Sequence, residues 1–189
     1  MNAKEKIENL LRQTGRKGME DLLAWMNENG FYDAPCSSKY HLAQPGGLAK
    51  HSLNVFTNAV KMAETLFEKL EDQITFETIE SLTICALLHD LGKAGQFGKP
   101  CYIENSGDDP AYSPYKTNND LLYIPHEIRS IVIASKFIDL TEQEQFAILY
   151  HNGLDGELTG FKGKEDPLLL ILHHADMWAA RVTEKEDRK

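Results

Sequence analysis

Two aspartates within otherwise apolar helical segments constrain the fold of this chain more than any other feature of its sequence. Asp90 follows His89 near the end of the apolar segment 79–91, and Asp176 lies inside the apolar segment 170–178. An ionised carboxylate in an apolar core is costly unless a positive group compensates it, and a divalent cation does this well. We therefore expect the two acids to share one positive partner.

Apolar residues recur with helical spacing along most of the 189 residues. The pattern predicts helices over residues 3–13, 19–29, 48–70, 79–91, 128–138 and 168–182. Thr141 and Glu144 form a capping box for another helix, which runs to about Tyr150. The predicted fold class is therefore all-α, and a chain of this length favours a single domain over residues 1–189.

The stretch 92–125 interrupts this helical pattern and is rich in glycine, proline and tyrosine. A connection of this length is either functional or poorly ordered. Asn118-Asn119 separates two extended runs within it, which predicts a small β-hairpin over residues 112–124.

The His89-Asp90 pair alone is weak evidence, because a hydrogen-bonded pair or a helix C-cap would explain it equally well. Its surroundings are more specific. Segment 86–93, which contains the pair, resembles the central motif of the HD-domain phosphohydrolase superfamily, and segment 46–52 resembles the family's upstream first-ligand helix. Segment 175–181 is similar to its last motif. The resemblance implies a helical metal-site core over residues 36–182, preceded by N-terminal helices over 1–30, with His51, His89, Asp90 and Asp176 as metal ligands.

Two further histidines resemble the additional ligands of HD proteins that hold two metals. His126 follows a proline at a predicted helix start, and His151 precedes a glycine-rich turn at a helix end. A carboxylate can bridge two cations, so Asp90 is the expected bridge of a two-ion site. The alternative is a one-metal enzyme in which His126 and His151 only touch substrate phosphate. The sequence departs from the HD-GYP pattern, because residues 157–161 replace the Gly-Tyr-Pro stretch.

Mixed imidazole and carboxylate ligands suit a divalent transition metal, namely Mn, Fe, Co, Ni or Zn, with Mg as a further candidate. Such a metal lowers the pKa of water, which provides a nucleophile for attack on phosphorus. Asp90 and Lys93 are the predicted catalytic residues. Lys93 lies three residues after Asp90, and we assign it to charge stabilisation of the phosphate. Its alternative role is to stabilise the helix C-terminus.

Three more residues are candidates for substrate binding: His41, Tyr115 and Lys116. Tyr115 and Lys116 can stack on a base and hold its phosphate, although ordinary packing of the hairpin explains them too. His41 is a phosphate contact, a support for a metal ligand, or a structural loop residue. His173 and His174 flank Asp176, and we expect packing or ligand-supporting roles for them.

The acidic balance of the chain limits its partners. It has 20 Lys and Arg against 29 Asp and Glu, a formal charge of −9, so we expect weak binding of long duplex nucleic acid. The group Arg12, Arg16 and Lys17 is either a solvated helix end or a phosphate contact. No signal-peptide core or membrane span is visible, and three cysteines without CxxC spacing fit a reducing cytoplasm.

The sequence therefore predicts a metal-dependent phosphohydrolase that acts on a phosphomonoester or phosphodiester of a nucleotide or short oligonucleotide. A single-strand 3′-to-5′ exonuclease is one alternative, because segment 35–51 resembles the HD domains of certain bacterial 3′-to-5′ exoribonucleases. A non-catalytic, metal-dependent nucleotide-binding module is another. The acidic surface weighs against the exonuclease, and retention of six potential ligands with Lys93 weighs against the binding module.

Overall fold

The computed structural model describes residues 1–67, 76–107, 110–153, 163 and 165–185. Its helices are α1 (Ala3–Gln13), α2 (Met19–Glu28), α3 (Gly47–Phe67), α4 (Phe76–Leu88), α5 (His126–Ala134), α6 (Glu142–Tyr150) and α7 (Pro167–Trp178). A 3₁₀ turn η1 (Leu91–Ala94) follows α4, and a π-helical turn η4 (Ala179–Thr183) follows α7. The strands are β1 (Tyr102–Glu104) and β2 (Tyr115–Thr117). The predicted all-α class is confirmed.

Helix ends follow the local chemistry of the sequence. The capping box at α6 is confirmed, because Thr141 Oγ1 accepts from the Glu144 N–H and the Glu144 carboxylate accepts from the Thr141 N–H. Asp166 caps α7 in front of Pro167, which needs no N–H partner at the first helical position. The predicted helix 79–91 stops at Leu88, and residues 68–70 of the predicted helix 48–70 lie outside the described residues.

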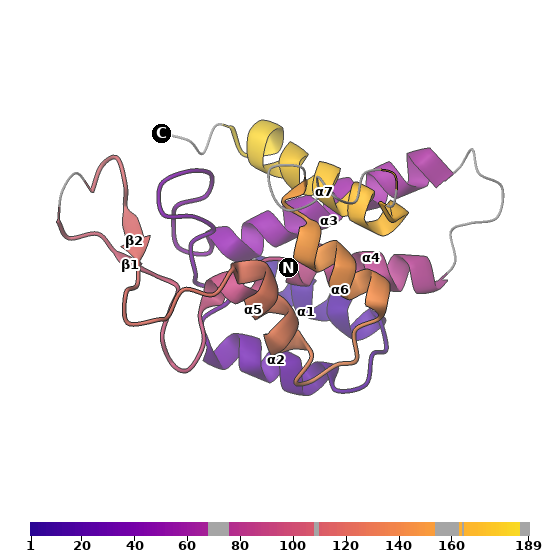
Figure 1. Ribbon diagram of the computed structural model, residues 1–189, viewed down its shortest axis with the longest axis horizontal. Coiled ribbons are helices and arrows are strands. Elements are labelled where there is room, and N and C mark those ends of the chain that lie inside the picture. Colours follow the sequence, from indigo (N-terminus) through magenta and orange to yellow (C-terminus); the bar gives the residue numbers. More distant parts are fainter. Residues whose placement is uncertain (68–75, 108–109, 154–162, 164, 186–189) are drawn as a thin grey trace.

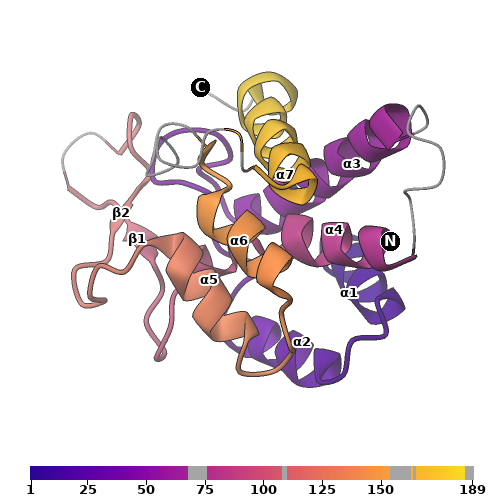
Figure 2. The same ribbon diagram turned by 45° about the vertical axis from the view of Figure 1, so that its right-hand side comes forward.

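Helices α1 and α7 pack against both α3 and α4, and α6 packs against α4 (Figures 1 and 2). Helix α3 packs on both α4 and α7, α6 packs on α7 and α5, and η1 packs on α5. Most of α4 from Leu82 onward is buried, because apolar residues cover all its faces. None of the described helices combines the length and the apolar character needed to cross a membrane.

The small sheet is present, but its predicted turn is wrong. Strand β1 pairs antiparallel with β2, Tyr102 opposite Thr117, so the connection runs through residues 105–114 and not through Asn118-Asn119. The Asn118 backbone N–H donates to the Cys101 carbonyl at 2.9 Å, and its side-chain amide donates to the Pro100 carbonyl at 2.9 Å. Asn118 therefore ties the end of β2 back to the chain before β1. The sheet extends to one side of the helices (Figures 1 and 2).

Arg16 is not a solvated helix end but part of an internal ion-pair network. Its guanidinium donates to Glu80 at 2.5 Å, to Glu144 at 2.9 Å and to the Asp139 carbonyl at 2.5 Å. Glu144 also accepts from the Ser81 hydroxyl at 2.8 Å. The network fastens the turn after α1 to α4 and α6.

This network predicts a pH dependence of stability. Burial opposes ionisation of Glu144, but Arg16, the Thr141 N–H and Ser81 outweigh it and hold the pKa of Glu144 below its ordinary 4.5. A lowered folded pKa stabilises the protein above the unfolded pKa and loses that contribution as pH falls through the folded value. We expect Glu144→Gln to lower the free energy of unfolding by about 3 kcal/mol at neutral pH. Below pH 4.5 the difference from the wild type should shrink; urea unfolding curves that stay equally separated down to acid pH would rule this out.

Candidate metal centre

The six predicted ligands come from separate elements that meet at one place. His51 lies near the start of α3, His89 and Asp90 directly follow α4, and His126 is the first residue of α5. His151 is the C-cap of α6, and Asp176 lies in α7. Most of the six predicted ligands lie at helix ends, because the chain can turn a side chain inward there without disrupting apolar packing.

Asp90 lies in the middle of this cluster and is 1% exposed. Its Oδ1 lies 3.1 Å from His126 Nε2 and 3.7 Å from His151 Nε2. Its Oδ2 lies 3.4 Å from His89 Nε2 and 3.7 Å from His51 Nε2. The two oxygens of one carboxylate therefore face two different pairs of imidazoles.

The histidines are held by the ring nitrogen that points away from Asp90. His89 Nδ1–H donates to the Ala86 carbonyl at 3.0 Å, and His151 Nδ1–H donates to the Ile148 carbonyl at 2.8 Å. Because a carbonyl only accepts, these bonds fix the proton on Nδ1 and leave a lone pair on Nε2. His126 Nδ1 lies 3.3 Å from Glu127 Oε2. Contacts of this kind on Nδ1 orient the rings of histidines that bind a metal through Nε2.

Two observations indicate that the cluster can hold a divalent cation. Of the buried side-chain atoms that the described part of the chain leaves without a hydrogen bond, three belong to this cluster: His89 Nε2, Asp90 Oδ1 and His126 Nε2. Buried polar atoms are otherwise almost always satisfied. In addition, the donors lie 3.1–3.7 Å apart around Asp90, close to the separation of about 3.0–3.4 Å between neighbouring ligands of one ion.

Electrostatics keep Asp90 and His151 in the protonation states that a cation needs. Burial opposes ionisation of Asp90, but Lys93 and His89 outweigh it and hold the pKa of this carboxyl well below its ordinary value. Burial, reinforced by His89, lowers the pKa of His151 to about 3, so its imidazole is neutral near pH 7. A carboxylate and neutral imidazoles are the ligand forms of these side chains. At His51 burial opposes the charge, but Cys36, Asp176 and Glu184 outweigh it and raise the pKa well above its ordinary value, so a bound cation must displace a proton there.

Lys93 lies beside Asp90, as the spacing predicts. The η1 turn brings Lys93 Nζ to 2.6 Å from Asp90 Oδ2. Burial opposes its charge, but Asp90 raises the pKa of Lys93 well above its ordinary value, so it is an ammonium. Gly92 makes this turn possible, because a Cβ there would lie 2.3 Å from the His126 carbonyl oxygen. The glycine thus allows η1 to approach α5 and brings Asp90 close to His126.

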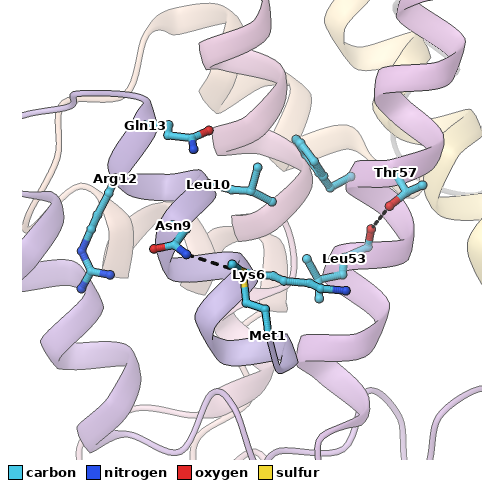
Figure 3. A pocket seen from close by; sticks show the side chains of 9 residues that line it. Met1, Lys6, Asn9, Leu10, Arg12, Gln13, Leu53 and Thr57 are labelled. Carbon is cyan, nitrogen blue, oxygen red and sulfur yellow. Dashed lines mark hydrogen bonds between the residues drawn. The ribbon is translucent and has the colours of Figure 1, made fainter.

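A cavity of about 540 Å³ opens over the cluster. It is lined by Tyr40, His41, Lys93, His151, Asn152, His173, Asp176, Met177, Ala180 and Arg181. A second hollow, of about 610 Å³, lies between α1 and α3, and Figure 3 shows Leu10 and Leu53 among its lining side chains. None of the clustered residues lines that second hollow. The first cavity is therefore the candidate substrate site.

The structure places the three predicted substrate contacts in different positions. His41 lines the cavity over the cluster. Tyr115 lies in β2 and lines a neighbouring hollow that also contains Lys93, whereas Lys116 is exposed on the same strand. A role of Tyr115 and Lys116 in substrate binding stays a prediction. His173 Nδ1–H donates to the His151 carbonyl at 2.8 Å and so supports a predicted ligand, whereas His174 is exposed.

Sequence reasoning did not identify Glu184, which the structure places behind His51. Glu184 is 1% exposed, and both of its carboxylate oxygens lie 3.1 Å from His51 Nδ1. The π-helical turn η4 brings it there, with the Glu184 N–H bonded to the Ala179 carbonyl. Glu184 stands in the charged segment 184–189, which reads as a solvated tail. Only the preceding π turn, which the sequence pattern does not reveal, turns it inward.

We expect Glu184→Gln to weaken metal binding by about 10- to 100-fold, as loss of such supporting groups typically does. Glutamine can still accept a hydrogen bond from His51, but it removes the negative charge that increases the basicity of the imidazole. Titration of metal-free protein with Mn²⁺ measures the affinity. Glu64→Gln, an exposed change of equal charge on α3, is the control. Equal affinities in both variants would assign Glu184 a packing role only.

In a comparison with known families, the HD domain model matches residues 48–188 of the chain. This span includes all six clustered histidines and aspartates, together with Lys93 and Glu184. Comparison with curated proteins and with solved structures gives no match.

Proposed function

Because the chain belongs to the HD-domain family, whose members are in general metal-dependent phosphohydrolases, we propose that it hydrolyses a phosphomonoester or phosphodiester bond of a nucleotide or short oligonucleotide. The observation that supports this most is the position of the cavity. Its lining includes His151 and Asp176 from the cluster and two cationic side chains, Lys93 and Arg181.

The proposed ligands are His51, His89, Asp90, His126, His151 and Asp176. In this proposal, His51, His89 and Asp176 would hold one ion together with Asp90, and His126 and His151 would hold a second ion together with the same carboxylate. When bound, the ions supply Lewis acidity, which lowers the pKa of water and offsets negative charge on phosphoryl oxygens. The separate imidazole pairs on the two oxygens of Asp90 support a bridging role for this residue.

Lys93 and Arg181 are proposed to bind the phosphate. Both line the cavity, and the chain as a whole carries a charge of −9, so these cations mark a local site for an anion. The planar guanidinium of Arg181 matches two phosphate oxygens, whereas the Lys93 ammonium acts as a point charge between the phosphate and Asp90. Each group therefore orients the phosphorus toward the cluster.

Size and an aromatic side chain support a nucleotide as the substrate. The cavity volume of about 540 Å³ lies within the range of small-molecule sites and is too small for a duplex. Tyr40 lines the cavity and is 63% exposed, so its ring offers a face for a base. His41, from the same loop, also faces this space. We infer that substrate enters phosphate first, with its base near Tyr40.

A substrate screen tests the proposal. Purified protein, stripped of metal and reloaded in turn with Mn²⁺, Co²⁺, Ni²⁺ and Mg²⁺, is incubated with nucleoside mono-, di- and triphosphates, cyclic nucleotides and short oligonucleotides. We expect phosphate release or phosphodiester cleavage that chelation abolishes and metal restores, with Arg181→Ala raising KM. Stepwise removal of 3′-terminal nucleotides from single strands would favour the exonuclease. Nucleotide binding without turnover under every metal would overturn the proposal in favour of a binding module.

A further inference from the structure

The loop between α2 and α3 places a cysteine and a histidine next to the cluster of six proposed ligands. Cys36 is completely buried, and its Sγ lies 3.4 Å from His41 Nε2 and 4.0 Å from Asp90 Oδ2. One donor atom from each of Cys36, His41 and His51 lies within 4.8 Å of the other two. Neither Cys36 nor His41 belongs to the six proposed ligands, so these two residues add a sulfur and a nitrogen donor to the site.

The backbone of this loop holds the two side chains in place. The Cys36 N–H donates to the Leu42 carbonyl at 3.1 Å, and the Ser37 hydroxyl donates to the His41 carbonyl at 2.9 Å. Leu42 is fully buried and adopts a φ of 50°, a left-handed conformation that is uncommon for leucine. These two hydrogen bonds link the start and the end of segment 36–42, so they hold the backbones of Cys36 and His41 close together.

The spacing of the pair matches co-ligation of one ion. In a tetrahedral zinc site, with Zn–S of about 2.3 Å and Zn–N of about 2.1 Å, sulfur and nitrogen ligands lie about 3.6 Å apart. The Cys36 Sγ to His41 Nε2 distance of 3.4 Å is close to this value. A thiol–imidazole hydrogen bond would give the same contact without an ion, so an experiment must separate the two.

We propose that Cys36, His41 and His51 form a site for a thiophilic divalent cation of the zinc class, at the edge of the phosphohydrolase centre. Thiolate sulfur favours zinc, cobalt or ferrous iron over magnesium, whereas the six-residue cluster offers only nitrogen and oxygen donors. This inference rests on the proposed function in one respect: His51 is a proposed ligand of both the new site and the six-residue centre.

Because His51 Nδ1 is hydrogen-bonded to Glu184, Nε2 is the nitrogen that either set of donors must use. One imidazole nitrogen binds one cation at a time. A thiophilic ion held by Cys36 and His41 therefore withdraws His51 from the six-residue centre. We therefore expect zinc to inhibit the hydrolysis that the protein carries out with manganese.

Cobalt tests the ligand set without any reference to activity. Metal-free protein is titrated with Co²⁺, and the near-ultraviolet thiolate-to-cobalt charge-transfer band is recorded for the wild type and for Cys36→Ser, Cys36→Ala and His41→Gln, with thermal melting as a check on folding. We expect the band in the wild type, its loss in both Cys36 variants and its weakening in His41→Gln. Cys101→Ser, which removes a partly buried thiol that is in none of the three-donor groups found among the described residues, is the control and keeps the band.

The same proteins give the functional consequence. With Mn²⁺ as the activating ion, we expect Cys36→Ser to require on the order of 10- to 100-fold more zinc for half inhibition than the wild type. No charge-transfer band in a folded, cobalt-loaded wild type, or a band that survives in folded Cys36→Ser and Cys36→Ala, overturns the thiolate site and leaves the phosphohydrolase proposal intact. A band without hydrolysis of any phosphate ester overturns the phosphohydrolase proposal alone.

Discussion

Replacement of Asp90 by asparagine is expected to lower phosphohydrolase activity by on the order of 10³-fold or more. The change keeps the shape of the side chain but removes its charge and replaces one oxygen with an NH₂ group. Both oxygens of Asp90 face imidazole nitrogens at 3.1–3.7 Å. An amide cannot supply two anionic donors there, so the variant loses the ligand on which both proposed ion positions depend.

Asp120→Asn is the matched control for this variant, because it removes the same charge from an exposed position in the chain after β2. It should retain wild-type activity. Melting curves of both variants show whether they are folded, and activity is measured at saturating Mn²⁺. A folded Asp90→Asn protein with at least half of the wild-type rate would contradict the central role of this carboxylate.

The second large effect concerns the number of ions. We expect the wild type to bind two equivalents of metal and the double variant His126→Ala, His151→Ala to bind one, with loss of most activity. Both histidines lie next to Oδ1 of Asp90, at 3.1 and 3.7 Å, whereas His51 and His89 lie next to Oδ2. Removing one pair therefore leaves the other side of the carboxylate with its own ligands.

Inductively coupled plasma mass spectrometry of dialysed protein measures the metal content directly. His174→Ala is the control, since His174 is an exposed histidine of α7, and it should bind two equivalents. One equivalent in the wild type and also in the double variant would favour the one-metal alternative, in which His126 and His151 only contact substrate phosphate.

Much of the fold was predictable because its determinants are local. Helical periodicity and the capping box at Thr141 depend on residues within a few positions of each other, and the structure confirms them. The conflict of ionised acids in apolar helices predicted only that Asp90 and Asp176 share a positive partner. The four histidines were predicted from the resemblance to the HD-domain superfamily. The family match over residues 48–188 agrees with that inference.

Other features depend on contacts between distant residues, which a single sequence does not reveal. Arg16 pairs with Glu144, which is 128 positions away, and so the basic group appeared solvated. The predicted hairpin turn at Asn118-Asn119 was wrong, because Asn118 bonds to Pro100 and Cys101 instead of forming the turn. Glu184 reaches His51 only through a π-helical turn. Cys36 belongs to no metal-binding spacing, so the sequence did not indicate that it lies beside the six proposed ligands.

Anomalous diffraction from crystals grown with Mn²⁺ locates the bound ions. We expect two anomalous peaks on either side of Asp90, about 3.5–4 Å apart. One is expected within ligand distance of His51, His89 and Asp176, and the other within ligand distance of His126 and His151. Crystals that contain Mn²⁺ but show no peak at Asp90 would rule out a metal centre at this carboxylate.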